Sequence, residues 1–484
     1  MVNKVYSFLA AVLFFLLSGL TLAGGEKTLT VIQTADLHGN IAKNRIFRTA
    51  ELIRRATEES GGVQNSIRID CGDLFQGSYA MTFAPCRQAM TEILNELQFD
   101  VFVPGNHDLD FGIRNLEKVL LPFRGTLLGA NWQWKNFPGR KDYVILHRNG
   151  LKVAVIGLGY HHAAAGISRP AEKGLIRTLP ARRSLQKLMP SLMKEKPHII
   201  LLALHAGEYT RLEQGRTIRD LVREFPQIDL VLSAHSHQEC RGAKVLNNTV
   251  RIQAPALGKG IAVARLVYDT EKYAVRSLKT EIISLDGNTP VHSGIFRSFH
   301  SLNRIVRNSS RKPVGNIPFE LSPLRRRTTS NAWTELCGKA IAKATGAEIV
   351  FYTPASRFRK TPGILTEQEL FLLIPHEESA GVLDLTADEC KEILSEQFRN
   401  QRKGYFQAPY GFRFQWKRSR VTALTFPGKR KERYRCAFSD YALSGAGGRF
   451  PLLKKIAEKQ KIPFQSLPIR DLLRNYIAVH YPAD

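Results

Sequence analysis

Cysteine is scarce in this sequence, and no short cysteine motif is present. The chain of 484 residues contains 6 cysteines, which are widely scattered and never spaced as CxxC. Their spacing argues against a zinc knuckle or a similar small zinc site. Free buried thiols and disulfide bonds are equally compatible with this pattern, and the sequence defines no pairing.

Long apolar runs are absent after the first 23 residues, so we expect no later segment to span a bilayer. Within residues 1–23, Lys4 makes the N-terminal region basic, and residues 8–17 form a short apolar stretch. Thr21-Leu22-Ala23 then resembles a cleavage site that ends in a small residue. This order is typical of a secretory signal peptide that is cleaved after Ala23. We therefore expect a periplasmic or secreted protein. The alternative is that residues 1–23 stay in place as an uncleaved membrane anchor.

Acidic residues are few relative to basic ones. The chain has 43 Asp and Glu against 70 Lys and Arg, a net charge of +27, and such a field attracts anions. RNP, basic-zipper and zinc-finger signatures are all absent, so no specific nucleic-acid recognition is expected. The charge is compatible with a phosphorylated small-molecule substrate, with peripheral contact with an anionic cell envelope, or with a merely solvated basic surface.

The order of apolar and polar segments predicts two domains. Residues 28–270 alternate strand-like and helix-like segments, which indicates α/β layering. The pattern changes at the polar turn formed by residues 286–290, and no internal repeat is visible. We predict a first domain over residues 24–290, a linker helix over residues 291–311, and a second domain over residues 312–484.

Five polar motifs each follow a strand-like run in the first domain. They are Asp36-Leu37-His38, Gly72-Asp73, Gly105-Asn106-His107-Asp108, His205 and His235-Ser236-His237. Ligands of open α/β sheets gather beyond the carboxyl ends of the strands, so we expect these motifs to meet. Imidazole, carboxylate and amide groups together suit zinc, manganese or iron better than calcium. The motifs supply enough ligands for two divalent metal ions and one spare histidine, which is typical of metal-assisted hydrolysis.

These motifs resemble those of the calcineurin-like metallophosphoesterases. More narrowly, they resemble the secreted 5′-nucleotidase and 2′,3′-cyclic-nucleotide phosphodiesterase family. The matching stretches are residues 36–40, 72–78, 105–112 and 235–237, and Ala234 replaces the usual glycine. The resemblance implies an α/β fold: a four-layer αββα metallophosphoesterase sandwich followed by a second, α+β domain similar to the 5′-nucleotidase C-terminal domain.

The resemblance also implies a role for each motif residue. The first metal ion would be held by Asp36, His38, Asp73 and His237. The second would be held by Asp73, Asn106, His205 and His235, with Asp73 bridging the two. His107 would face the substrate phosphate, where it stabilises the transition state or protonates the leaving oxygen, and Asp110 would orient it. Asp108 is expected to be a turn or cap residue.

The second domain resembles the family's base-binding domain more weakly. Phe406 and Phe450 correspond to the two aromatic residues that clamp the base, and an aromatic pair fits a flat ligand by stacking. Arg357 is the one residue kept from a glycine-rich family loop, and its guanidinium is suited to phosphate. Core packing for each Phe and simple solvation for Arg357 are the alternatives. The usual Pro-Phe-Gly-Asn reads Pro375-His376-Glu377-Glu378, and His376 is expected to be a surface or packing residue.

The sequence therefore predicts an exported two-metal phosphoesterase that hydrolyses nucleotide phosphate esters, with a 5′-nucleotidase favoured. A 2′,3′-cyclic-nucleotide phosphodiesterase, a UDP-sugar hydrolase and a sulfur-ester hydrolase are the enzyme alternatives. The non-enzyme alternative is a basic binding protein for phosphorylated ligands. The residues leave the identity of the metal, the exact substrate and the oligomeric state open.

Overall fold

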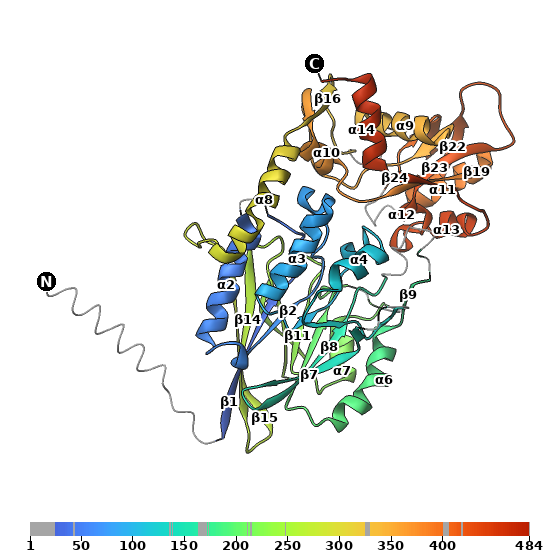
Figure 1. Cartoon of the computed structure of the whole chain (residues 1–484). Helices are drawn as coiled ribbons and strands as arrows, with labels where there is room; N and C mark the ends of the chain where they lie inside the picture. Colours follow the sequence, from blue (N-terminus) through green and yellow to red (C-terminus); the bar gives the residue numbers. More distant parts are fainter. Residues whose placement is uncertain are drawn as a thin grey trace.

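The computed structural model of the chain shows two domains joined by a helix (Figure 1). It describes residues 25–41, 44–134, 137, 139–162, 172, 174–210, 212, 215–246, 248–324, 330–399, 406–417 and 420–483. The signal peptide predicted over residues 1–23 lies outside the described residues.

The first sheet of the first domain has seven strands in the order β15-β14-β1-β2-β3-β4-β6. In that order they span Ala274–Ser284, Gly260–Asp269, Glu26–Thr34, Ser66–Asp70, Val101–Phe102, Thr126–Leu128 and Arg140–Lys141. β1, β2 and β3 are parallel neighbours, with Val31 opposite Ile67 and Ile69 opposite Val101. Their carboxyl ends, and the motifs that follow them, therefore lie at one edge of the sheet.

The second sheet has six strands in the order β12-β13-β11-β10-β8-β7. In that order they span Cys240–Leu246, Thr249–Gln253, Leu230–Leu232, Ile199–Leu204, Leu151–Leu158 and Tyr143–Arg148. β10 is parallel to both β8 and β11, with Leu202 opposite Val231. The motifs after β10 and β11 thus also share an edge. A separate antiparallel pair joins β5 (Trp132–Trp134) to β9 (Ile176–Thr178).

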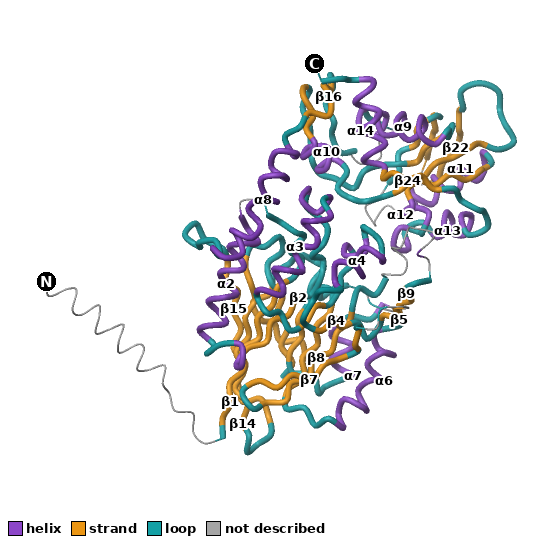
Figure 2. Tube along the Cα trace, viewed as in Figure 1, coloured by secondary structure: helices purple, strands orange, loops and turns teal. Residues whose placement is uncertain are grey.

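The two sheets pack face to face and are covered by helices on their outer sides (Figure 2). Fully buried aliphatic residues of both sheets, such as Val31, Ile69, Val155 and Leu201, form the central core. The first sheet is covered by α2 (Arg45–Glu59), α3 (Ala84–Glu96) and α4 (Ile113–Leu120), and the second by α6 (Ala181–Lys194) and α7 (Ile218–Glu224). Strands covered on both faces have near-continuous apolar sequences, as here. The predicted αββα sandwich is confirmed.

A long helix leads from the first domain to the second. This helix, α8, spans Ser293–Ser310, inside the range 291–311 proposed for the linker. His292 caps its start by accepting a hydrogen bond from the Ile295 backbone at 3.3 Å. Ile295 and Phe299 are buried in the core beneath α2 and α3, so the helix is packed against the first domain along its first half.

The second domain is built on a five-stranded sheet in the order β20-β17-β23-β19-β24. In that order the strands span Pro409–Tyr410, Ile349–Phe351, Tyr434–Ser439, Ser379–Leu385 and Phe464–Pro468. Along β17, Val350 joins the core under α9 (Ala332–Thr345) and α14 (Ile469–His480). Ile349 and Phe351 point to the opposite face, which packs on α11 (Ala387–Arg399) and α13 (Pro451–Ala457). The predicted α+β second domain is confirmed.

The remaining elements of the described chain are short. Two antiparallel pairs join β16 (Pro313–Ile317) to β18 (Gly363–Thr366) and β21 (Arg413–Lys417) to β22 (Arg420–Thr425). The short helices are α10 (Glu367–Leu373) and α12 (Asp440–Leu443), with 3-10 turns at Val63–Asn65, Tyr79–Thr82, His107–Leu109 and Ala446–Gly448.

All six cysteines are free thiols. The Cys390 and Cys436 sulfur atoms are 3.9 Å apart, which is too far for a disulfide bond. Within the ranges given above, none of the helices has the length and apolar character needed to cross a bilayer.

Candidate metal centre

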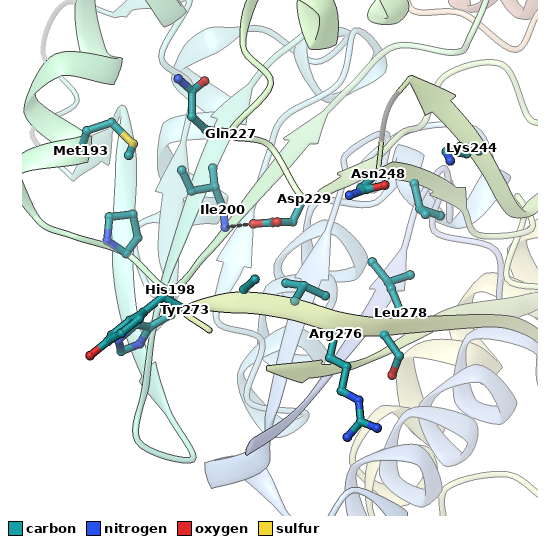
Figure 3. Close-up of a pocket in the computed structure, with 15 residues that line it drawn as sticks. Met193, His198, Ile200, Gln227, Asp229, Lys244, Asn248, Tyr273, Arg276 and Leu278 are labelled. Atoms are coloured by element: carbon teal, nitrogen blue, oxygen red, sulfur yellow. Dashed lines mark hydrogen bonds between the residues drawn. The ribbon is translucent and has the colours of Figure 1, made fainter. Parts of the chain in front are cut away.

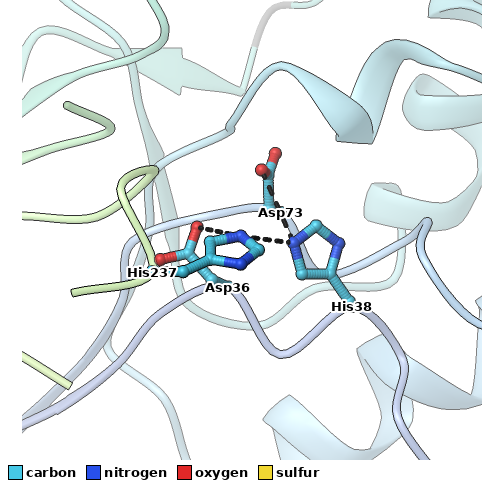
Figure 4. A group of neighbouring side chains, drawn as sticks. All are labelled: Asp36, His38, Asp73 and His237. Carbon is cyan, nitrogen blue, oxygen red and sulfur yellow. Dashed lines mark hydrogen bonds and ion pairs between the residues drawn. The ribbon is translucent and has the colours of Figure 1, made fainter. Parts of the chain in front are cut away.

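The five polar motifs converge where the carboxyl edges of the two sheets meet. Asp36, His38, Asp73 and His237 place one ligand atom each within 4.8 Å of one another (Figure 4), and Asp73, His205 and His235 form a second group of the same kind. His38 Nε2 lies 3.0 Å from His237 Nε2. Asp73 Oδ2 lies 3.9 Å from His38 Nε2 and 3.3 Å from His205 Nε2. Asp73 therefore stands between the two groups, as a bridging carboxylate must.

Backbone strain is concentrated on the candidate ligands. Five of them adopt positive φ, a region that residues other than glycine visit rarely. They are Asp36 (53°), His38 (52°), Asp73 (57°), His235 (71°) and His237 (56°). Each sits just past a strand, where the chain turns sharply and aims the side chain across the sheet edge. Strain of about 1–3 kcal/mol per residue persists only where the surroundings enforce it, and such residues cluster at functional sites.

Two glycines allow the loops after β2 and β3 to touch. Gly72 has φ +89°, and a Cβ there would lie 2.4 Å from the backbone nitrogen of Gly105. A Cβ on Gly105 would lie 2.2 Å from Asp73 Oδ1 and 2.5 Å from His205 Cε1. Any side chain at either position would displace the bridging carboxylate or its neighbours, so the close approach requires glycine.

The Asp108 side chain links the same two loops by hydrogen bonds to their backbones. Its carboxylate is fully buried and accepts four backbone hydrogen bonds. The donors are Asp73 N (2.9 Å), Leu74 N (2.8 Å), Phe75 N (3.0 Å) and Gly105 N (2.7 Å). Asp108 was expected to be a turn or cap residue, and its hydrogen bonds agree with that structural role. They fix the backbone of the loop that carries Asp73.

Backbone carbonyls orient two of the candidate imidazole ligands. His38 Nδ1 lies 2.6 Å from the Gln76 carbonyl oxygen, and His205 Nδ1 lies 2.7 Å from that of Cys71. A carbonyl only accepts hydrogen bonds, so we infer that each Nδ1 carries the proton. The Nε2 atom of each ring is then the one that faces the cluster, and it binds a metal ion once it carries no proton, the usual arrangement around a metal ion.

Unpaired buried atoms show that the donor set fits metal ions. Asn106 Oδ1 is buried and has no hydrogen-bond partner, and His205 Nε2, despite its proximity to Asp73, makes no hydrogen bond of acceptable geometry. Buried polar atoms are nearly always paired, so two unpaired atoms in the loops that carry the candidate ligands are the pattern expected of metal-binding residues. Carboxylate, amide and imidazole donors together match divalent ions of the zinc or manganese kind. The structure brings six of the seven predicted metal ligands together in two groups that share Asp73. Asn106 directly precedes His107, whose backbone N–H donates to Asp73 Oδ1.

Burial and mutual charge perturb these groups strongly. Burial raises the pKa of Asp36 to about 7 and lowers the pKa of His38 to about 4 and that of His235 to about 3. Burial alone would raise the pKa of Asp73, but the charge of nearby His205 holds it well below its ordinary value. Neutral imidazoles at His38 and His235, and an ionised carboxylate at Asp73, are the forms in which these residues bind metals.

His107 stands beside the ligands and not among them. Its Nδ1 lies 3.0 Å from Asp110 Oδ2, and its backbone N–H donates to Asp73 Oδ1 at 2.8 Å. The His107 ring lies 5.6 Å from that of His38. Burial alone would lower the pKa of His107, but Asp110 and Asp73 raise it to about 10. His107 and Asp110 therefore form the predicted pair, with Nε2 of His107 left to face a ligand.

His376 of the second domain reaches this pair. Its ring stacks on that of His107 at 5.3 Å with 16° between the planes, and its Nδ1 lies 3.9 Å from Asp110 Oδ2. His376 was expected to be a surface or packing residue; the structure shows that the loop after α10 carries it across the domain boundary and packs it on His107. The unusual sequence Pro375-His376-Glu377-Glu378 was the one signal that could have found it.

The predicted base clamp is only partly available. Phe450 is 1% exposed and packs in the core between the sheet, α11 and α13. It directly precedes Pro451, the first residue of α13, and its burial in that core favours the alternative of core packing over stacking on a base. Phe406 is half-buried with its ring 5.5 Å from Phe398. Arg357 is exposed in the segment after β17. The roles of Phe406 and Arg357 stay predictions.

Two further residues of the second domain lie near Tyr160, which itself contacts the candidate ligand His235. Arg449 donates to the Tyr441 hydroxyl at 2.8 Å. Burial raises the pKa of Tyr160 to about 12, with smaller contributions from nearby Tyr441 and Asp73. The Tyr160 ring in turn lies 4.9 Å from that of His235. The sequence assigned no role to Tyr441 or Arg449.

A cavity of about 590 Å³ lies at the opposite edge of the sheets (Figure 3). Its lining includes His198 and Ile200, at the start of β10, whereas His205 follows the end of that strand. Asp229 in this cavity accepts a hydrogen bond from the Ile200 backbone at 2.8 Å. Burial raises the pKa of Asp229 to about 6. None of the predicted site residues lines this cavity, so it is separate from the metal centre.

Comparison with known families matches both domains. The calcineurin-like phosphoesterase family model matches residues 29–239, and the model of the 5′-nucleotidase C-terminal domain matches residues 313–455. The first domain is thus a domain of the calcineurin-like phosphoesterase kind. The second is a domain of the 5′-nucleotidase C-terminal kind.

Curated relatives are distant and longer. The chain is 23% identical over 424 residues to the trifunctional nucleotide phosphoesterase protein YfkN of Bacillus subtilis, which covers 78% of this chain and 28% of YfkN. It is 24% identical over 328 residues to the 2′,3′-cyclic-nucleotide 2′-phosphodiesterase/3′-nucleotidase of Haemophilus influenzae, covering 54% of this chain and 49% of that protein. The chain therefore spans less than half the length of these relatives.

A solved structure matches nearly the whole chain. A presumed 5′-nucleotidase from Staphylococcus aureus superposes with a TM-score of 0.77 at 17% identity, covering 94% of this chain and 98% of that one. At this identity the likeness establishes the shared two-domain fold.

Proposed function

We propose that this protein is a metal-dependent phosphoric ester hydrolase whose substrates are nucleotide phosphates, with a 5′-nucleotidase activity favoured. The observation that carries the proposal is Asp73, a buried carboxylate shared by two groups of candidate ligands with the His107–Asp110 pair beside it. The alternative substrate is a 2′,3′-cyclic nucleotide, which is named for the Haemophilus influenzae relative. Two neighbouring groups of candidate metal ligands disfavour a mere binding protein for phosphorylated ligands.

The residues divide the chemistry among themselves. Asp36, His38, Asp73 and His237 would hold one divalent ion, and Asp73, Asn106, His205 and His235 the other. When bound, such ions supply Lewis-acid polarisation of phosphoryl oxygens and lower the pKa of a coordinated water. The protein contributes orientation and charge placement, the main sources of catalysis in phosphoryl transfer.

His107 acts on the leaving group in this proposal. As a water oxygen bonds to phosphorus, the bond between phosphorus and the ester oxygen breaks. His107 Nε2–H donates its proton to that oxygen, so that an alcohol leaves. Asp110 accepts a hydrogen bond from His107 Nδ1–H at 3.0 Å, which keeps His107 Nε2 directed at the substrate.

We also propose that the protein acts in the periplasm or outside the cell. Support comes from the order of basic, apolar and small residues over positions 1–23. Fractionation of the host cells, with N-terminal sequencing of the mature protein, tests this. A mature chain beginning at Gly24 is expected, and an intact Met1 on a cytoplasmic protein would contradict the proposal.

Turnover of defined substrates tests the activity. The purified protein is loaded with manganese or zinc, and phosphate or nucleoside release is measured from AMP, 2′,3′-cyclic AMP, a UDP-sugar and an aryl phosphate. We expect AMP to be the best substrate. If the cyclic nucleotide is the best substrate, the 2′,3′-cyclic-nucleotide phosphodiesterase alternative is favoured. If the aryl phosphate is the best substrate, the proposal that the protein recognises nucleotides is wrong. If none is hydrolysed, the whole proposal is refuted.

A further inference from the structure

His376 is a histidine of the second domain that lies in the active site of the first. Its ring covers one face of His107 at 5.3 Å, nearly parallel, and its Nδ1 is 3.9 Å from Asp110 Oδ2. His107 Nδ1 contacts the same oxygen atom at 3.0 Å. Two imidazoles thus share one carboxylate, and His107, Asp110 and His376 bring their polar atoms within 4.8 Å of one another.

The loop that carries His376 is anchored on both sides. Before it, Gln76 Nε2 of the first domain donates to the Pro375 carbonyl. After it, Glu377 pairs with Arg470, and both side chains are 5% exposed. Next, Glu378 accepts a hydrogen bond from the Tyr352 hydroxyl at 2.9 Å.

These contacts fix the position of His376 in the folded protein. Arg470 also donates to the Ile374 carbonyl at 3.0 Å, so the same guanidinium grips the loop on either side of His376. A buried ion pair of this kind is costly to break, because it would leave a charge without its partner. The loop cannot swing His376 away from Asp110 without losing these contacts.

We propose that His376 is a positioning residue that keeps His107 and Asp110 in their reactive geometry. The inference rests on the proposed hydrolase function. A ring stacked on one face of His107 restricts its rotation about χ2, a torsion that is otherwise broad. A second imidazole at Asp110 keeps the shared oxygen directed at His107 Nδ1. Catalysis depends on such placement, since a misplacement of 1 Å can lower the rate about 100-fold.

The first test is His376→Ala in the full-length, zinc-loaded protein. We expect kcat for AMP to fall about tenfold while KM changes less than about twofold, because His376 acts through His107 and Asp110. The loss should be smaller for an aryl phosphate, since a phenolate departs with little help from a proton donor. A matched control is His480→Ala, which removes a histidine that stacks on Tyr476 of the same domain at 3.9 Å; it should behave as wild type.

Two further variants separate stacking from polar contact. His376→Phe keeps a ring over His107 and removes the nitrogen near Asp110, and His376→Gln keeps a polar group and removes the ring. We expect both to fall between His376→Ala and wild type in kcat for AMP. A readout other than turnover is the proton NMR signal of His107 Nδ1–H, which should move or broaden in His376→Ala and stay in place in His480→Ala.

The outcomes separate this inference from the proposed function. An unchanged kcat for AMP and an unchanged His107 signal in His376→Ala would overturn the positioning role alone. An equal loss on both substrates, or a loss confined to KM, would also overturn it. If wild type hydrolyses no phosphate ester, the proposed function fails, and the His107 signal still decides whether His376 positions that ring.

Discussion

Replacement of Asp108 by Asn should damage the metal centre although Asp108 is not a ligand. Its two carboxylate oxygens each accept two backbone N–H groups. Oδ2 serves Asp73 N and Gly105 N, and Oδ1 serves Leu74 N and Phe75 N. An Asn side chain keeps one oxygen and presents an NH₂ group in place of the other. Two buried N–H donors would then face a donor and lose their acceptor.

The expected loss of stability follows from those two donors. An unsatisfied buried N–H costs about 1–3 kcal/mol, so Asp108→Asn should lower the free energy of unfolding by about 2–6 kcal/mol. The NH₂ group of the Asn side chain would also repel the backbone N–H groups that it faces and displace their loop. If that is the pair at Asp73 and Gly105, the backbone that presents the bridging carboxylate moves, and metal affinity falls with stability.

Urea unfolding of the metal-free protein, with calorimetric titration of zinc, measures both effects. A control is Asp110→Asn, in the same motif, because the Asp110 side chain is 19% exposed and bonds to the side chain of His107. Asp110→Asn should lower the free energy of unfolding by less than Asp108→Asn, because Asp110 accepts from the side chain of His107 and not from four buried backbone N–H groups. A free energy of unfolding for Asp108→Asn within 0.5 kcal/mol of wild type, together with unchanged zinc affinity, would refute the assigned role (a threshold at about the noise of surface substitutions).

Two other predictions follow from the site and from the remote cavity. His107→Ala should lower kcat for AMP by about 10²–10⁴-fold while both metal equivalents stay bound, because it removes the proton donor and no ligand; full activity in this variant would contradict the assignment. Asp229→Asn should raise stability at pH 8 by about 1–2 kcal/mol, since the pKa of this partly exposed carboxyl is raised in the fold from 3.8 to about 6 and its ionised form disfavours folding. That gain should shrink as the pH falls through 6 and vanish below about 4, where both folded and unfolded chains are protonated. Thermal unfolding across this pH range checks the sign, and a destabilised variant at pH 8 would contradict it.

The sequence predicted the first domain well because its signals are local. Runs such as Ile199–Leu204 are apolar and β-branched, and each ends in a polar motif at a strand exit. Parallel strands then bring those exits to one edge without further information. The short strands β4 and β6 at one end of the first sheet, of three and two residues, have too few residues for a pattern.

The second domain was less predictable because its roles depend on contacts across the chain. Phe450 has the side chain that either a core position or a base clamp requires, and only the packing of α11 and α13 decides for the core. His376 reaches His107 from 269 positions away, a difference of the two residue numbers that no local pattern encodes. Asp108 had a recognisable structural role, but its four backbone partners come from two loops and required coordinates.

Metal titration with phosphate release tests the central claim most directly. Metal-free protein is titrated with manganese or zinc while hydrolysis of AMP is followed, for wild type and for Asp73→Asn. The account predicts no turnover without metal, a rise that saturates at two equivalents in wild type, and no recovery in Asp73→Asn. Full turnover in the presence of excess chelator, or wild-type saturation in Asp73→Asn, would contradict it.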